Sequence, residues 1–280
     1  MMKNVISASR RTDIPAYYLN WFMDKIKDGV LYVQNPFYKK NMKRVDLSPE
    51  SVEWIVFWSR NYSKFLNNRS FFNRFRLFFH FTILSHHPLL EKINLPQSKV
   101  IGQIESLVRH YGCDHIIWRY DPIICWQEGN QIKSNFNKTD FEFYCRQFSA
   151  LGLKQCYFSY VTDYAKFKTR FRKKAPDRQI LPADNTAFDN ILTEMRNISF
   201  NSGIELFTCC NDRLIGFNTR KGHCISGSRL NLLAGKKTVS EAKAATRPDC
   251  GCTRSVDIGN YLQQPCYFGC IYCYANPVWE

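Results

Sequence analysis

Residues 54–61 read Trp-Ile-Val-Phe-Trp-Ser-Arg-Asn, five large apolar residues followed directly by three polar ones. A short run of β-branched and aromatic residues that stops at a turn signal predicts a buried strand. Further runs of this kind occur at residues 4–9, 30–34, 77–82, 115–119, 155–160 and 205–209. Helical patterns separate most of them, and strands that alternate with helices predict a parallel sheet. These stretches therefore indicate an α/β fold.

The helical patterns cover residues 13–27, 95–111, 138–151 and 187–199, and a further helix is expected to open at Ser48-Pro49-Glu50. Ser48 as N-cap with Pro49 at the first helical position is a helix-start signal, as is Asp13 two residues before Pro15. Repeated strand–helix units predict a full or partial (β/α) barrel of the TIM type. We expect a barrel body at residues 1–212 and a cysteine-rich iron–sulfur segment at 213–280 that packs on the barrel mouth.

The chain contains twelve cysteines in 280 residues. Its first residues carry only the short apolar run 5–8 before Arg10 and Arg11, which is too short for a secretion signal, and no run of about 18 apolar residues occurs. These features predict a cytoplasmic protein outside the membrane, with thiols kept reduced. Clustered cysteines are then expected to bind metal or act as redox groups. Isolated ones, Cys113, Cys125, Cys145 and Cys156, are expected to be small buried hydrophobes.

The most specific motif lies at residues 264–277, which read Gln-Pro-Cys-Tyr-Phe-Gly-Cys-Ile-Tyr-Cys-Tyr-Ala-Asn-Pro. Cys266, Cys270 and Cys273 are separated by three and then two residues. Three thiolates on one loop can hold a 4Fe-4S cluster and leave one iron without a protein ligand. Zinc is the alternative occupant of such a loop.

This loop resembles the cluster loop of the radical S-adenosylmethionine superfamily, above all the Pro-Cys-x-x-Gly-Cys-x-Tyr-Cys-Tyr loops of its spore photoproduct lyase-like branch. The whole chain resembles an uncharacterised bacterial family of unknown function whose carboxy-terminal cysteines have the same appearance. The resemblance implies that S-adenosylmethionine binds the open iron and, with an electron donor, yields a 5′-deoxyadenosyl radical. The superfamily places its loop after the first barrel strand, whereas here the loop follows all the predicted strands.

Polar residues follow several predicted strands, and reactive groups in barrels lie at the carboxyl ends of strands. We expect Arg10, Asp13, Arg119 and Asp121 to be catalytic, because each stands directly beside an apolar strand. The guanidinium fork suits a carboxylate or phosphate. The residues expected to bind cofactor are Arg10, Arg11, Asn35, Arg60 and Arg119. The alternative is that these residues are ordinary polar surface loops.

A second set of cysteines precedes the loop. Cys209, Cys224, Cys250 and Cys252 are predicted to form a four-thiolate site for zinc or a second iron–sulfur cluster. The alternatives are a resolving thiol pair, plain buried cysteines, or closure of the first cluster's fourth iron by Cys250 or Cys252. In that last case the cluster would be a sealed electron carrier.

The formal net charge of +15 favours an anionic partner, for which DNA or RNA is the natural candidate. Residues 166–174 interleave Phe167 and Phe171 with cations, as single-strand binders do. The alternative is an amphipathic helix with both rings in the core. The sequence thus predicts a radical S-adenosylmethionine-type enzyme acting on an anionic substrate. The alternative is a non-catalytic iron–sulfur or zinc protein that binds nucleic acid, and a third is an electron carrier.

Overall fold

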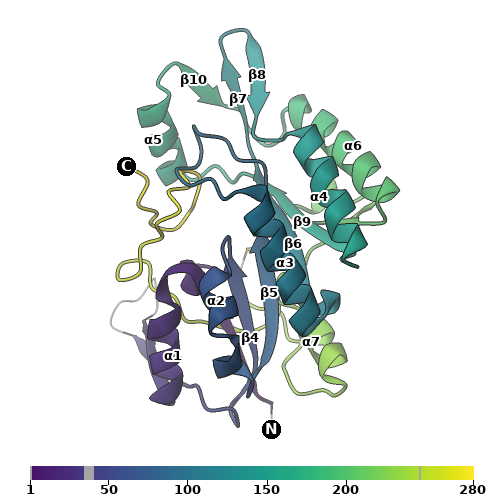
Figure 1. The fold of residues 1–280 in the computed structure, drawn as a ribbon. Coiled ribbons are helices and arrows are strands. Elements are labelled where there is room, and N and C mark those ends of the chain that lie inside the picture. Colours follow the sequence, from purple (N-terminus) through teal and green to yellow (C-terminus); the bar gives the residue numbers. More distant parts are fainter. Residues whose placement is uncertain (1, 35–40, 246) are drawn as a thin grey trace.

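The computed structural model describes residues 2–34, 41–245 and 247–280, and its centre is an eight-stranded parallel sheet (Figure 1). The strand order is β12-β11-β9-β6-β5-β4-β1-β13, so seven strands follow one another in chain order and β13 lies beside β1. The strands are β1 (Asn4–Ala8), β4 (Val52–Ser59), β5 (Arg76–Thr82), β6 (Ile116–Ile123), β9 (Gln155–Tyr160), β11 (Glu205–Thr208), β12 (Thr219–Lys221) and β13 (Val256–Asp257). The predicted parallel α/β fold is confirmed. Within the described ranges no ladder joins β12 to β13, and the closed barrel stays a prediction.

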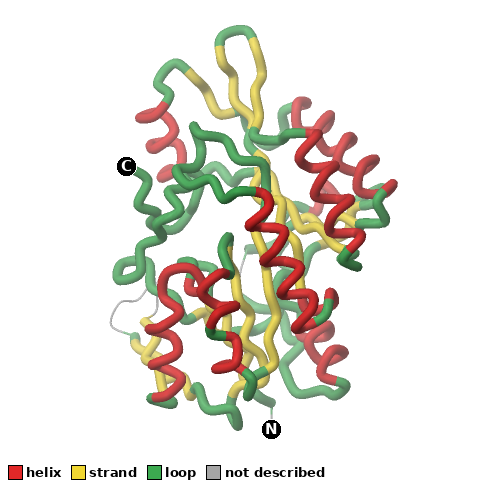
Figure 2. The backbone as a smooth tube through the Cα atoms, viewed as in Figure 1, coloured by secondary structure: helices red, strands yellow, loops and turns green. Residues whose placement is uncertain are grey.

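Both faces of the sheet are buried, as expected for parallel strands. Because side chains alternate along a strand, Ile55 and Phe57 of β4 join the core beneath the helices, while Trp54 and Val56 join a second core on the other face. The first face is covered by α1 (Leu19–Lys27), α2 (Ser63–Asn67), α3 (Gln97–Tyr111), α4 (Lys138–Ala150) and α6 (Thr186–Asn201), which flank the strands in Figure 2. The second face carries α7 (Gly227–Ala234) and the cysteine-bearing segments around it.

Two sequence predictions near the amino terminus are wrong. Residues Val30–Gln34 (β2) form no part of the parallel sheet but pair antiparallel with β3 (Met42–Asp46). Their connection is too short for the crossover that a parallel pair needs, and the buried partners Leu31 and Val45 fix the hairpin on the core. The helix expected at Ser48 is a single turn, with the Val52 amide donating to the Ser48 carbonyl over 3.0 Å, because the apolar run that follows enters β4.

The remaining predicted helices are confirmed, with one difference at residues 13–27. There a short π-helix (Ile14–Tyr18) precedes α1, and the Asp13 side chain caps it. Other short helical turns are Arg69–Phe72, Cys113–His115 and Asp212–Leu214. A small antiparallel sheet of β7 (Cys125–Glu128), β8 (Gln131–Ser134) and β10 (Arg178–Ile180) extends beyond β6.

The basic stretch 166–174 lies in α5 (Ala165–Lys174). Phe167 and Phe171 are buried and most of the cations are exposed, so the amphipathic-helix alternative is confirmed.

The segment 213–280 contributes to the sheet itself, since β12 and β13 both belong to it. The division at residue 212 remains a prediction. In the described ranges, no helix combines the length and apolar character required to span a bilayer.

Candidate functional site

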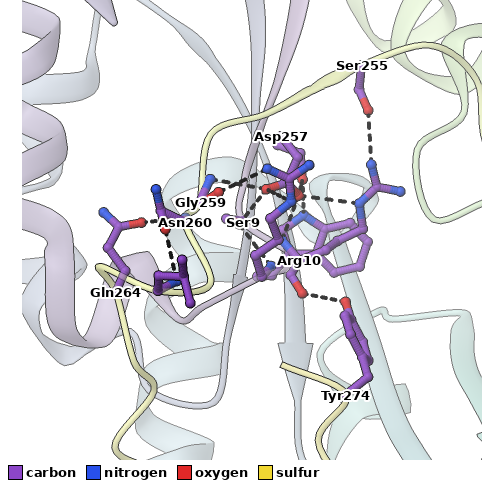
Figure 3. Close-up of polar contacts among 12 residues, drawn as sticks. Ser9, Arg10, Ser255, Asp257, Gly259, Asn260, Gln264 and Tyr274 are labelled. Carbon is purple, nitrogen blue, oxygen red and sulfur yellow. Dashed lines mark hydrogen bonds and ion pairs between the residues drawn. The ribbon is translucent and has the colours of Figure 1, made fainter. Parts of the chain in front are cut away.

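The carboxyl ends of the parallel strands meet at one edge, and the tail of the chain is bound there. Asp257, at the end of β13, accepts hydrogen bonds from the Ser9 hydroxyl at 2.6 Å and the Arg10 amide at 2.8 Å (Figure 3). The Tyr274 hydroxyl donates to the Arg10 carbonyl. Ser9 and Arg10, which follow β1, are thereby hydrogen-bonded both to β13 and to Tyr274 directly after the cysteine loop.

The loop cysteines lie against residues that follow β1 and β4. Cys266, Cys270 and Cys273 share a small apolar cluster with Ala16 and Phe268. Burial raises the pKa of the Cys270 thiol to about 11 and also raises the pKa of Cys266 and Cys273. Thiols in such surroundings stay protonated unless a cation replaces their protons, which is the condition that a metal or cluster provides.

Arg60, predicted to bind cofactor, connects the loop to a buried carboxylate. Its Nη1 donates to Cys270 Sγ over 3.1 Å, and its two nitrogens bind the Glu91 carboxylate at 2.6 and 2.8 Å. The Tyr272 hydroxyl also donates to Glu91. Burial acts to raise the pKa of Glu91, but the charge of Arg60 and these hydrogen bonds outweigh it and lower the pKa to about 2. Glu91 was missed because it follows no predicted strand.

Asp13 is a buried carboxyl beside the same loop. It accepts hydrogen bonds from the Ser59 hydroxyl at 2.7 Å and from the amides of Arg60 and Ala16, both at 2.9 Å. Burial raises its pKa to about 6, and its charge contributes to the raised pKa of Cys266. A carboxyl that titrates near neutral pH can serve as a general acid or base.

Arg170 of α5 holds the backbone of the loop. Its Nη1 donates to the carbonyl oxygens of Ile271 at 3.2 Å and Cys273 at 2.6 Å, and its Nη2 donates to Ala275 at 3.1 Å. Sequence reasoning missed this residue, although a signal was present. Arg170 falls on the same helical face as Phe167 and Phe171, where a lone cation needs a buried partner.

Five further cysteines, Cys209, Cys210, Cys224, Cys250 and Cys252, form a ring of thiols. Cys209 Sγ lies 3.5 Å from Cys224 Sγ and 3.9 Å from Cys210 Sγ. Cys210 also lies close enough to Cys250, Cys250 to Cys252, and Cys252 to Cys224 for the thiols to shift one another's pKa. The structure thus brings together the four cysteines predicted as one site and adds Cys210, which was missed. Cys250 and Cys252 contact the ring thiols rather than the loop.

Cys210 adopts φ 55°, a left-handed conformation that is uncommon for a residue with a side chain. Such strain persists where the surroundings enforce it, often at functional sites. The signal in the sequence was its position next to Cys209.

Arg119 donates a hydrogen bond to a sulfur of the thiol ring, as Arg60 does to a sulfur of the loop. Its Nη1 donates to Cys224 Sγ over 3.2 Å, while its Nη2 pairs with Asp121, which also accepts from Ser159. Hydrogen bonds from the Cys209 and Cys252 thiols lower the pKa of Cys224, and Arg119 acts in the same direction. Cys224 is therefore the ring position best suited to carry negative charge.

Arg119 packs against a stacked pair of aromatic rings, Trp58 and His80. The guanidinium lies 5.4 Å from the centre of the Trp58 ring, and His80 stacks on Trp58 at 3.9 Å. Burial lowers the pKa of His80 to about 3, so the ring is neutral at pH 7. Its Nε2 lies 2.6 Å from the Cys224 carbonyl and must donate to it, which leaves Nδ1 as a buried acceptor without a partner.

The remaining predicted residues divide three ways. Arg11 donates to the Gly259 carbonyl at 3.1 Å and lies 5.6 Å from the Tyr261 ring centre. Asn35 lies outside the described residues. Cys125, Cys145 and Cys156 are buried in the apolar core as predicted, and Cys113 packs at its margin. The catalytic and cofactor-binding roles expected for Arg10, Arg11, Asp13, Arg60, Arg119 and Asp121 remain predictions.

A family model described as "Domain of unknown function (DUF1848)" matches residues 5–275. The chain belongs to the DUF1848 family. The match spans the parallel sheet, the thiol ring and the cysteine loop. No curated protein matches the chain.

The thiol ring of this DUF1848 chain is consistent with metal binding. A tetrahedral ion with metal–sulfur bonds of about 2.3 Å holds its ligands about 3.8 Å apart. The separations of 3.5 and 3.9 Å at Cys209 match that value. Among the described residues, no group of three or more His, Cys, Asp or Glu side chains already has an arrangement suited to an ion. Metal binding would therefore require the thiols to rotate toward a common centre.

Proposed function

We propose that this DUF1848 chain is an iron–sulfur enzyme of the radical S-adenosylmethionine type that acts on an anionic substrate. Cys266, Cys270 and Cys273 would hold a 4Fe-4S cluster with one iron open to the cofactor. The observation that carries the proposal is the position of this loop. Its three thiols lie together beside the carboxyl ends of β1 and β4, with a guanidinium directed at one sulfur.

The groups around the loop suit such a site. When bound, the cluster and S-adenosylmethionine supply one-electron chemistry that generates an organic radical. Arg60 and Glu91 orient Cys270, and Arg170 fixes the loop carbonyls. Asp13 can hold or release a proton beside Cys266. Arg10, which follows β1, carries a guanidinium suited to a carboxylate or phosphate.

The test is anaerobic reconstitution of the full chain with iron and sulfide. We expect about four iron and four sulfide per chain at the loop, a spectrum in electron paramagnetic resonance that changes when S-adenosylmethionine is added, and reductive cleavage of the cofactor. Cys270→Ser should abolish all three, and Cys125→Ser, a core cysteine, should not. A cluster that ignores the cofactor would rule out the enzyme, and binding of zinc alone would rule out the cluster.

A second candidate function is nucleic-acid binding without catalysis. The observation that favours it is the exposed cationic face of α5, which lies beside the loop through the Lys166 to Asn276 hydrogen bond of 2.9 Å. Phosphate contacts release counterions. The affinity for a labelled oligonucleotide should therefore fall steeply as the salt concentration rises from about 50 to about 200 mM. Absence of binding at the lower salt concentration would remove this candidate.

A further inference from the structure

We propose that the thiol ring of Cys209, Cys210, Cys224, Cys250 and Cys252 is a second and separate site, which binds one thiophilic divalent ion, Zn²⁺ or Fe²⁺, through four thiolates. The proposal does not depend on the cluster at Cys266, Cys270 and Cys273. It goes beyond the function proposed above because it assigns a mononuclear metal site to a different part of the tail.

The spacing of the sulfurs favours one ion over a cluster. The ligands of a tetrahedral ion are mutual neighbours about 3.8 Å apart, whereas a four-iron cube binds each thiolate at a different corner and spreads them further. Cys209 lies 3.5 Å from Cys224, which is a proposed ligand, and 3.9 Å from Cys210, which is not. Among the described residues no three His, Cys, Asp or Glu side chains already surround an ion position. Binding therefore requires the four ligand thiols to rotate toward a common centre, and a tetrahedral site leaves the fifth thiol unbound.

The surroundings compensate the charge that such a site would carry. A divalent ion with four thiolates has a net charge of −2, and a buried charge requires partners of opposite sign. Arg119 donates to Cys224 Sγ over 3.2 Å. The charge of Arg10 acts on Cys224 and Cys252, and that of Arg247 acts on Cys209, Cys210 and Cys250.

A cavity gives an ion a route to the ring. It has a volume of about 360 Å³ and is lined by His223, Glu241, Lys243, Cys250 and Gly251. The His223 Nδ1 is engaged with the Gly251 carbonyl at 2.6 Å, so its Nε2 is the nitrogen that can meet an entering ion. A Cβ on Gly251 would lie 2.6 Å from His223 Nδ1 and 3.0 Å from the Gly222 carbonyl. Only glycine between Cys250 and Cys252 allows this close approach.

Cys210 is the thiol assigned to remain unbound. Cys209 and Cys210 are both half-buried, whereas Cys224, Cys250 and Cys252 are buried. Of the two half-buried thiols, Cys209 contacts Cys224 at 3.5 Å, and Cys210 has the left-handed backbone. Loss of Cys210 alone leaves a complete set of four ligands. Loss of two ring cysteines leaves three, which cannot complete a tetrahedral thiolate site.

The test uses the full chain with Cys266, Cys270 and Cys273 all changed to Ser, so that the loop cannot bind metal. This variant is the parent protein for the further replacements. The protein is reduced, kept anaerobic and titrated with Co²⁺, whose tetrahedral thiolate complexes absorb strongly. We expect saturation at one ion per chain and displacement by Zn²⁺. Cys210→Ser should keep the affinity within about tenfold, and Cys224→Ser with Cys252→Ser should lower it by a factor on the order of 100 or more. Cys125→Ser with Cys156→Ser is the matched control and should bind like the parent.

A second measurement does not require a ring variant to fold. Zinc should protect Cys209, Cys224, Cys250 and Cys252 of the parent protein from alkylation, as read by mass spectrometry, and leave Cys210 reactive. Equal alkylation with and without zinc, or cobalt absorption that survives the double ring replacement, would overturn the proposal. Because the parent lacks the loop thiols, failure of the loop to hold a cluster leaves this result unaffected.

Discussion

Arg60 donates a hydrogen bond from Nη1 to the Sγ of Cys270 over 3.1 Å. Arg119 makes the same kind of contact with Cys224 over 3.2 Å. Arg60 directly follows β4, whereas Arg119 lies within β6, level with Thr82 at the end of β5. Each arginine is paired with a carboxylate, Glu91 or Asp121. The edge of the sheet thus presents one guanidinium to the cysteine loop and one to the thiol ring. Since a guanidinium stays protonated, both contacts stabilise negative charge on sulfur.

Replacement of Arg60 tests this contact at the loop. Arg60→Gln together with Glu91→Gln removes both charges and leaves no unpaired carboxylate. The net charge near the loop is then unchanged, but the hydrogen bond to Cys270 Sγ is lost. Hydrogen bonds to sulfur favour the reduced cluster, so the variant should have a lower reduction potential in a titration followed by electron paramagnetic resonance. The exposed Arg74→Gln is the control. An unchanged potential would show that the Arg60 contact is merely structural.

Glu91 should make the stability of the protein depend on acid. Its pKa is about 2 in the folded chain against an ordinary value of 4.5, so its stabilising effect is present above about pH 4.5 and is lost as the pH falls toward 2. Glu91→Gln leaves the guanidinium of Arg60 without its buried partner and should reduce the free energy of unfolding by about 3 kcal/mol at pH 7. The difference from the unmodified chain should shrink below pH 4.5 in urea titrations. Glu105→Gln, at an exposed position, should show no such difference at any pH.

Arg170 should determine the order of the cysteine loop. Arg170→Ala removes the donor for three backbone carbonyls, those of Ile271, Cys273 and Ala275. Hydrogen bonds from a charged group contribute about 1.5–3 kcal/mol each, and buried carbonyls left unpaired are costly. We expect faster amide hydrogen exchange over residues 271–275 with little change in the sheet. Arg172→Ala on the exposed face of α5 is the matched control, and equal exchange in the two variants would contradict the prediction.

Charge reversal on α5 decides whether its cationic face binds nucleic acid. Lys168→Glu, Arg172→Glu and Lys174→Glu change exposed positions only. If this face neutralises phosphates, the triple variant should bind a labelled oligonucleotide at least about tenfold more weakly and with a smaller dependence on salt. The control carries Lys27→Glu, Lys64→Glu and Lys236→Glu, which change the net charge equally at exposed positions elsewhere. Equal loss in both variants would mean that only net charge matters.

Part of the candidate site could be read from spacing along the chain. Cys266, Cys270 and Cys273 lie within eight residues of one loop, so they stay near one another however the rest of the chain folds. Cys209, Cys224, Cys250 and Cys252 were grouped only because clustered cysteines suggest a shared site. Cys210 is not part of that predicted set. Neighbouring side chains point to opposite sides in an extended strand, and at Cys210 the backbone is left-handed instead.

The sequence by itself determined the parallel α/β class, most helix positions and the cysteine loop, because each rests on a pattern within about 20 residues. Only the tertiary structure decided that Arg60 faces Cys270, that Arg170 faces the loop carbonyls and that five thiols close into a ring. The contacts of Arg60 with Cys270, Arg170 with Cys273 and Cys209 with Cys224 join residues 210, 103 and 15 positions apart. Chain folding around the sheet sets such distances, and no local spacing records them.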